Sequence, residues 1–241
     1  FLNEDVDMEK ISKDSRNFTG AEITALVKSA ASFALERSKR NEEEVIILMR
    51  DFERALKETT PSFGISKSLS QLDNFLLYPS CNKIINLGNE IINRLRLGTS
   101  PKTLSLLLYG ENGVGKTSIS HYIAKISGVP FIRSVSPRDL VGLEENEKVN
   151  YIKRTFKDAY RSDESLVILD DIEGLMDYVP IGPRFSNYVL QAMKIFIRNC
   201  DKNRLLVIGT TSDISLMDDS GIIKSFNENV YVSKCNEDDV N

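Results

Sequence analysis

The chain has 241 residues, of which 41% are hydrophobic and 27% are charged. This composition is typical of a soluble globular protein with one full domain and a smaller attached unit, and it excludes disordered and fibrous proteins. The formal net charge of −4 disfavours nonspecific binding to nucleic acid, which requires clustered Lys and Arg side chains. We therefore expect no nucleic-acid partner.

The first residues, "FLNEDVD", are acidic and carry no initiator Met. They lack the basic and apolar regions of a signal peptide, and no apolar run reaches the length of about 18 residues that a membrane-spanning helix needs. Cys81, Cys200 and Cys235 lie far apart, without metal-binding or redox spacing, and suit a reducing compartment. We expect a fragment of a cytoplasmic protein that is not inserted in a membrane.

Residues 1–58 are predicted to form a small all-α unit. Thr19 and Glu22 in "TGAE" have the spacing of a capping box. Apolar residues follow at helical spacing and predict one buried stripe, formed by Ile23, Leu26, Val27, Ala30, Ala31, Ala34 and Leu35. A second helix is predicted at "RDFERALKE", with Asp51 as its cap and with Phe52, Ala55 and Leu56 facing inward.

The rest of the chain predicts an α/β fold. Pro, Gly, Ser and Thr in "TTPSFGISKS" indicate a linker over 59–72. After a helix at about 81–97, strand-like apolar runs ("TLSLLLYG", "PFIRSV", "SLVILDD", "RLLVIGTTS") alternate with helices from Lys116, over about 146–161 and over about 184–199. Such alternation is typical of a parallel sheet with helices on both faces. His121, the only histidine, is interpreted as a surface or packing residue.

The segment "GENGVGKT", from Gly110 to Thr117, fits the G-x-x-x-x-G-K-[ST] pattern of phosphate-binding loops. Its glycines let backbone N–H groups curl around phosphate oxygens, Lys116 supplies a positive charge, and Thr117 offers a hydroxyl to Mg²⁺. The alternative is a glycine-rich turn with an incidental Lys. The position of the loop after an apolar run and before a helix favours the phosphate site.

A second apolar run, "LVILDDIEG" at 166–174, ends in two acids, Asp170 and Asp171. A buried strand that presents carboxylates at its carboxyl end is a common source of a Mg²⁺ ligand beside a phosphate loop. We expect Asp170 to hold Mg²⁺ together with Thr117. The alternative is that Asp170 only caps the next helix.

With these motifs, the chain resembles the AAA ATPases, and within them the N-ethylmaleimide-sensitive factor group of hexameric ATPases that take SNARE complexes apart. The resemblance is carried by "DDIEGLMDYVPIGPRFSNYVLQA" at 170–192 and by "NFTGAEITALVKSAASFALERS" at 17–38. It implies that residues 1–58 are the helical lid of a first ATPase module. Residues 73–241 would then be the core of a second module without its own lid, built on a five-stranded parallel sheet.

The resemblance also implies ATP and Mg²⁺ as cofactors. Thr117 and Asp170 would hold the metal, and the catalytic positions would be Asp171 and Ser212. The residues implied to bind the nucleotide are Asp73, Asn74, Phe75, Leu76, Leu77 and Tyr78 at the adenine, and Gly110, Asn112, Gly113, Val114, Gly115, Lys116, Thr117, Ser118 and Ile119 at the phosphates. Residues 73–78 could alternatively be plain core or linker contacts.

Several positions depart from the pattern of an active AAA site. Asp171 stands where the family has a Glu that polarises the attacking water, and Ser212 stands where it usually has Asn. The stretch 213–230, where the family carries arginines that reach across the subunit boundary, contains no Arg and only Lys224. Leu140 replaces the aromatic residue of the pore loop. These departures predict tight ATP binding and weak hydrolysis.

Assembly and partners follow from the resemblance alone. It implies a homo-hexamer, which the second module stabilises by binding Mg·ATP. The hexamer would act on SNARE complexes through a SNAP-type adaptor. The location would be the cytoplasm, at vesicle and Golgi membranes, peripheral to the lipid. The alternative is another AAA protein-remodelling ATPase with a different protein substrate.

Overall fold

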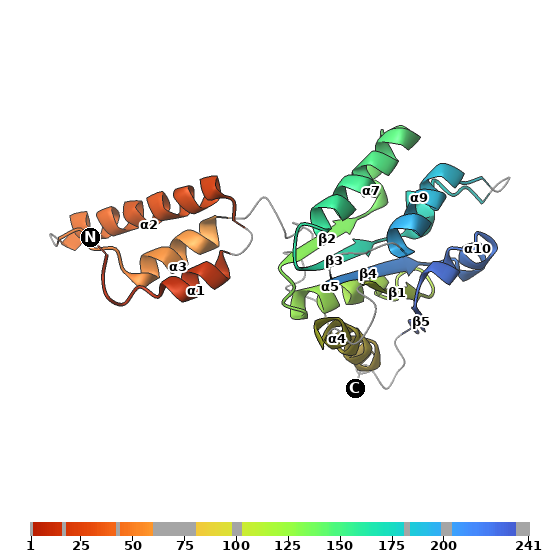
Figure 1. Cartoon of the computed structure of the whole chain (residues 1–241), viewed down its shortest axis with the longest axis horizontal. Helices are drawn as coiled ribbons and strands as arrows, with labels where there is room; N and C mark the ends of the chain where they lie inside the picture. The colour runs from red at the N-terminus through yellow and green to blue at the C-terminus, as the bar shows by residue number, and fades with distance from the viewer. Residues whose placement is uncertain are drawn as a thin grey trace. The chain divides into compact units, whose positions relative to one another are not determined.

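The computed structural model describes residues 2–15, 18–41, 44–59, 81–97, 103–180, 184–198 and 204–234. The chain divides into two compact units, Phe1–Ile65 and Ser66–Asn241 (Figure 1). Of the predicted linker over 59–72, only Thr59 lies within the described residues. In these ranges, none of the helices combines the length and the apolar character needed to cross a membrane.

The described residues of the first unit form three helices, α1 (Met8–Asp14), α2 (Gly20–Asn41) and α3 (Met49–Glu58). The predicted capping box is present at the start of α2, where the Thr19 N–H donates to Glu22 Oε2 at 2.7 Å and the Glu22 N–H to Thr19 Oγ1 at 3.4 Å. The core of the unit combines residues from all three helices, namely Ile11, Leu26, Ala30, Phe52 and Ala55.

Two expectations for this unit were wrong. The buried stripe of α2 is narrower than predicted, because Leu26, Ala30 and Ala34 are buried while Ile23, Val27 and Leu35 are each more than 40% exposed. The buried residues lie on one line along α2, which Ser38 continues, and Phe33 packs beside it against the core of the unit. Asp51 does not cap α3 but lies in its first turn, where its carboxylate accepts the Leu48 N–H at 3.0 Å and pairs with Arg37 at 2.9 Å.

The second unit is built on a five-stranded parallel sheet, which confirms the predicted fold class. The strand order is β2-β3-β4-β1-β5, and every pairing is parallel. The strands are β1 (Thr103–Tyr109), β2 (Phe131–Val135), β3 (Glu164–Leu169), β4 (Arg204–Thr211) and β5 (Glu228–Tyr231). The order places β4, the last strand but one in sequence, between β1 and β3.

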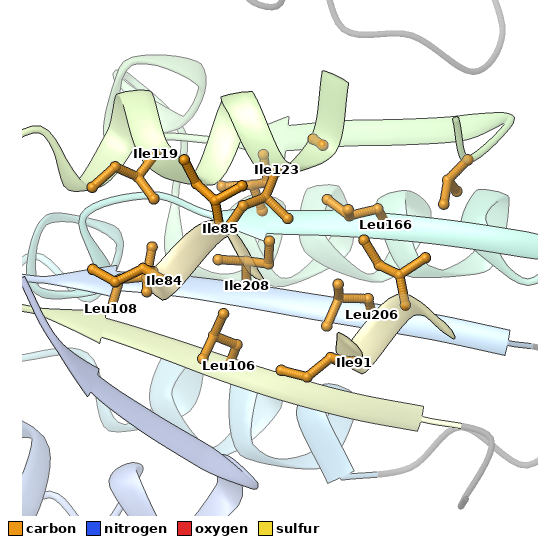
Figure 2. Packing of buried hydrophobic residues seen from close by; sticks show 14 of the residues in the cluster. Ile84, Ile85, Ile91, Leu106, Leu108, Ile119, Ile123, Leu166, Leu206 and Ile208 are labelled. Carbon is orange, nitrogen blue, oxygen red and sulfur yellow. The ribbon is translucent and has the colours of Figure 1, made fainter. Parts of the chain in front are cut away.

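Helices cover both faces of this sheet (Figure 1). The helices α4 (Asn82–Leu97) and α5 (Lys116–Ile126) pack on one face, and α7 (Glu145–Ala159) and α9 (Asn187–Arg198) pack on the other. Figure 2 shows the core under α4 and α5, where Ile84, Ile85 and Ile91 meet strand residues such as Leu106, Leu166 and Ile208. The strand residues between them, Leu107, Val167 and Val207, are fully buried on the other face, as expected for parallel strands covered on both sides.

The described loops of this unit contain four short elements, of which the first three follow β2, β3 and β4 at the carboxyl edge of the sheet and the last directly precedes β5. These are α6 (Pro137–Leu140), α8 (Ile172–Leu175), α10 (Ile214–Asp219) and the 3₁₀ helix η3 (Ile223–Ser225). Helix α9 begins at Asn187 rather than near residue 184, because Ser186 Oγ accepts the Val189 N–H there at 3.2 Å. Arg184 instead forms an antiparallel bridge with Val179.

Candidate functional site

A cavity of about 890 Å³ opens at the carboxyl ends of the strands. Its size is that of a pocket for a small ligand. Because all strands are parallel, their carboxyl ends meet at this edge, as in other open α/β sheets that bind ligands there. Among the residues expected from the sequence to form the site, the cavity is lined by Asn112, Gly113, Gly115, Lys116, Thr117, Ser118, Asp170, Asp171 and Ser212.

The loop from Gly110 to Gly115 depends on glycine at specific positions. Gly115 has φ 89°, a left-handed conformation that directs the chain into α5, and Gly113 has φ 84°. A Cβ atom on Gly110 would lie 2.4 Å from the carbonyl oxygen of Val232, so this position requires the close backbone approach that only glycine permits. The loop is therefore held against the end of β5.

Lys116 lies at the centre of this loop and is 8% exposed. Its Nζ donates to the carbonyl oxygens of Gly110 at 2.8 Å and Glu111 at 2.6 Å. Burial lowers the pKa of the ammonium group, and the carboxylates of Glu173, Asp170 and Asp171 oppose that shift in this order. The ammonium group is thus held inside the curl of the loop, with negative charges beside it.

Asp170 is the centre of a cluster of oxygen atoms. The register pairs Leu169 of β3 with Gly209 of β4, so that Asp170 lies beside Thr210. Asp170 Oδ1 accepts the hydroxyl of Thr117 at 2.8 Å and that of Thr210 at 2.7 Å. Carboxylate and hydroxyl oxygens beside a phosphate loop are ligands that suit Mg²⁺, so the residues present fit this metal.

Asp171 is held differently from Asp170. Its backbone has φ 57°, and its carboxylate accepts the Gly174 N–H at 3.4 Å, which caps the short helix α8. Its own N–H donates to Thr210 Oγ1 at 2.9 Å. Burial is the main cause that raises the pKa of Asp171, and the charge of Glu173 adds to it. Asp171 thus lines the cavity while its carboxylate also caps α8.

Ser212 connects the end of β4 to the phosphate loop. Its Oγ donates to Asn112 Oδ1 at 2.5 Å, and its N–H donates to Glu173 Oε1 at 2.6 Å. Glu173, which sequence reasoning did not single out, therefore lies at this end of the site.

His121 is a buried residue rather than a surface residue, and in addition to packing it faces the cavity. It is 7% exposed, lines the cavity, and its Nε2 atom is buried with no hydrogen-bond partner among the described residues. Burial lowers the pKa of this imidazole, so the ring is neutral at pH 7, while the charge of Asp170 opposes the shift. The sequence signal was available, because residue 121 lies four positions after Thr117 on the same face of α5.

Some predicted residues lie away from the cavity lining. Gly110, Val114 and Ile119 do not line it, because Val114 packs against the core and Ile119 is fully buried there. Residues 73–78, expected at the adenine, lie outside the described residues. In the expected pore loop Leu140 is buried and its neighbour Val141 is 80% exposed.

Further residues that were not expected from the sequence complete the lining of the cavity. Besides His121, these are Ser134, Ser136, Pro137, Arg138, Asp139, Thr210 and Thr211. They follow or end β2 and β4, whose carboxyl ends reach the same edge as those of β1 and β3. The rule that ligands bind at the carboxyl ends of parallel strands would have indicated them.

Comparison with known families gives two matches along the chain. Residues 106–234 match the family described as "ATPase family associated with various cellular activities (AAA)". Residues 5–53 match the AAA+ lid domain. The first match covers the cavity and the sheet apart from the first three residues of β1, and the second covers α1, α2 and the first half of α3.

Individual relatives align over nearly the whole chain. "Vesicular-fusion protein SEC18" of Saccharomyces cerevisiae is 36% identical over 258 residues, covering 100% of this chain and 34% of the yeast protein. "Vesicle-fusing ATPase" of Dictyostelium discoideum is 38% identical over 240 residues, covering 93% of this chain and 32% of that protein. The protein of the same name from Arabidopsis thaliana is 33% identical over 240 residues, covering 94% and 32%. The chain thus spans about a third of the length of these relatives.

Proposed function

This chain belongs to the AAA family of ATPases, and from that premise we propose that residues 73–241 form a module that binds Mg·ATP tightly and hydrolyses it slowly. The observation that carries the proposal is the joint hydrogen bonding of Thr117 and Thr210 to Asp170, beside the loop that encloses Lys116. Thr117 and Asp170 would hold the metal, which neutralises charge on phosphate oxygens when it is bound.

Slow hydrolysis follows from the surroundings of Asp171. Its carboxylate is turned to the Gly174 N–H, it is one methylene shorter than Glu, and burial disfavours its charged form. A displacement of about 1 Å from the productive position can cost on the order of a hundredfold in rate. The absence of Arg from 213–230 removes a second source of catalysis, worth about a thousandfold or more.

Within a longer protein, we propose that this is the second ATPase module of a homo-hexamer, that its bound nucleotide stabilises the ring, and that residues 1–58 are the lid of the first module. The lid match over residues 5–53 supports this order of modules. The names of the relatives support a role in vesicle fusion. As its substrates we propose SNARE complexes, reached through a SNAP-type adaptor. The proposed place is the cytoplasm, at the surface of vesicle and Golgi membranes.

Titration calorimetry and phosphate release on the 241-residue chain test the proposal. We expect ATP binding that requires Mg²⁺, and turnover well below about one per second, the lower end of ordinary enzymes. Asp170→Asn should abolish the Mg²⁺ requirement and weaken binding, whereas Asp218→Asn, at an exposed acid of α10, should change neither. Binding that is indifferent to Mg²⁺, or turnover of one per second or faster, would contradict the proposal.

A further inference from the structure

Glu173 is a half-buried acid that the proposed chemistry does not use. It lies in the first turn of α8, three residues after Asp170. One carboxylate oxygen, Oε1, accepts the Ser212 N–H at 2.6 Å, and the other, Oε2, is buried without a partner among the described residues. A buried carboxylate oxygen without a hydrogen bond is destabilising, typically by a few kcal/mol. Its presence therefore needs an explanation beyond stability.

The surroundings of Glu173 place it against the phosphate-binding groups. Its charge is the strongest of the three that oppose the lowered pKa of Lys116, ahead of Asp170 and Asp171. It is also the charge that contributes most to the raised pKa of Asp171. Glu173 is thus electrostatically coupled to Lys116 and Asp171, although it does not line the cavity.

A continuous set of contacts leads from Glu173 to the phosphate loop. Glu173 fixes the backbone of Ser212, and the hydroxyl of Ser212 donates to Asn112 Oδ1 at 2.5 Å. Three segments that are far apart in sequence, α8, the end of β4 and the loop before α5, are joined by these two bonds. The position of Asn112 therefore depends on an acid that lies 61 residues away in the sequence and does not line the cavity.

We propose that Glu173 is a positioning residue for ATP binding, which holds Ser212 and, through it, Asn112 in the place that the outer phosphates require. The inference rests on the proposed function, because it assigns a role in the same nucleotide site. Lys116 of such a loop reaches the outer phosphates, and Ser212 and Asn112 line the cavity with it. Loss of the link should therefore weaken ATP binding more than ADP binding.

Two conservative variants separate position from charge. Glu173→Gln keeps the length of the side chain and a carbonyl oxygen that can accept the Ser212 N–H, but it removes the charge. Glu173→Asp keeps the charge but withdraws the acceptor by one methylene. Groups that orient a site from outside it commonly change affinity by about tenfold or more when they are lost. We expect Glu173→Asp to weaken ATP binding by about tenfold and ADP binding by less than about threefold. We expect Glu173→Gln to bind ATP as tightly as the wild type.

The dissociation constants of ATP and ADP are measured for the 241-residue chain in the presence of Mg²⁺. Ser212→Ala is combined with Glu173→Asp, because a residue that acts through the Ser212 hydroxyl should have no further effect once that hydroxyl is gone. Glu145→Asp, at an exposed acid on α7, is the matched control and should leave both constants unchanged.

The outcomes are distinct. A loss in Glu173→Gln with retention in Glu173→Asp would show that charge is what matters, and would overturn the positioning role. So would equal losses for ATP and ADP, additive effects with Ser212→Ala, or unchanged affinity in both Glu173 variants. A wild-type chain that binds no ATP would overturn the proposed function, and the inference with it. If the wild type binds ATP tightly but the Glu173 and Ser212 variants give any of the contrary results above, only the role of Glu173 is overturned and the proposed function stands.

Discussion

The hydroxyl of Thr210 donates to Asp170 Oδ1 at 2.7 Å and accepts the Asp171 N–H at 2.9 Å. One buried side chain on β4 thereby fixes both acids at the end of β3. Thr210 itself is 2% exposed. The relationship follows from the β3–β4 register, which ends with Leu169 opposite Gly209.

We predict that Thr210→Val weakens Mg·ATP binding through Asp170. Valine has nearly the same shape but no hydroxyl, so it leaves the Asp171 N–H unpartnered and frees Asp170 to rotate. Loss of one charge-assisted hydrogen bond is worth about 1.5–3 kcal/mol, so the concentration of Mg²⁺ needed for half-maximal ATP binding should rise about tenfold or more. Thr24→Val, on the exposed side of α2 in the other unit, is the control. An unchanged Mg²⁺ requirement in Thr210→Val would contradict the role assigned to this hydroxyl.

We predict that Lys116→Ala loosens the proposed hexamer. The variant loses the buried ammonium group of the phosphate loop and should bind ATP weakly. A nucleotide that binds only the assembled form stabilises it by linkage, so weaker binding favours dissociation. Sedimentation of the full-length protein at limiting concentration, with and without ATP, measures this, and Lys153→Ala on α7 serves as the matched control. An unchanged hexamer population in Lys116→Ala would count against the idea.

Gly110→Ala should lower the free energy of unfolding of the second unit by more than the strain of a positive φ would account for. The added Cβ would lie 2.4 Å from Val232 O, and that atom belongs to the backbone and cannot move aside cheaply. Gly128→Ala is a matched control, because its φ is also positive, at 60°, but nothing lies within 4 Å of its Cβ. Urea unfolding should show a loss of about 1 kcal/mol for Gly128→Ala and clearly more for Gly110→Ala. Equal losses would mean that the contact with Val232 is not limiting.

Stability should fall in mild acid because of His121. Burial lowers the pKa of the folded imidazole below its usual 6.5, so between these two pKa values the unfolded chain binds more protons. The stability that the neutral ring contributes is therefore complete above about pH 6.5 and is lost as the pH falls below it. Urea unfolding without nucleotide or metal at pH 7.5 and 5.5 should show a smaller loss for His121→Gln than for the wild type. The chain has one His, so equal losses would refute this assignment.

The sheet could be predicted from the sequence because strands buried on both faces appear as unbroken apolar runs, such as "LSLLLY" in β1. The phosphate loop could be predicted because its residues are local in sequence. The surface of α2 could not, because periodicity shows which residues share a face but not how much of it the neighbours cover. Ile23 and Val27 were expected to be buried for that reason and are exposed.

The role of Glu173 was also beyond reach of the sequence. Spacing alone drew attention to Asp171, which directly follows the proposed metal ligand. In the structure, the left-handed backbone of Asp171 turns its carboxylate to Gly174 and brings Glu173 to the N–H of Ser212. The left-handed φ of Asp171 thus determines which groups both acids contact. No sequence pattern predicts such a φ value at a non-glycine position.

A substantial rise in the slow rate of ATP hydrolysis should require two substitutions together. Asp171→Glu lengthens the carboxylate, but no neighbouring arginine stabilises the charge that develops on the transferred phosphoryl group. Lys224 is an exposed residue of η3 whose carbonyl oxygen accepts a hydrogen bond from Arg198 at 3.1 Å, so a side chain at this position projects from an anchored backbone. Lys224→Arg could therefore supply the missing group to an adjoining subunit.

We predict that Asp171→Glu and Lys224→Arg each raise the rate of single-turnover hydrolysis by less than about tenfold. In the double variant, the decrease in activation free energy should exceed the sum of the two single decreases, because groups of one catalytic unit are not additive. The gain should appear only in assembled rings and vanish on dilution below the assembly concentration, since the arginine acts across a boundary. Asp171→Glu with Lys153→Arg is the matched control. Strict additivity, or a gain that survives in the monomer, would show that the arginine position or the role of Asp171 is misassigned.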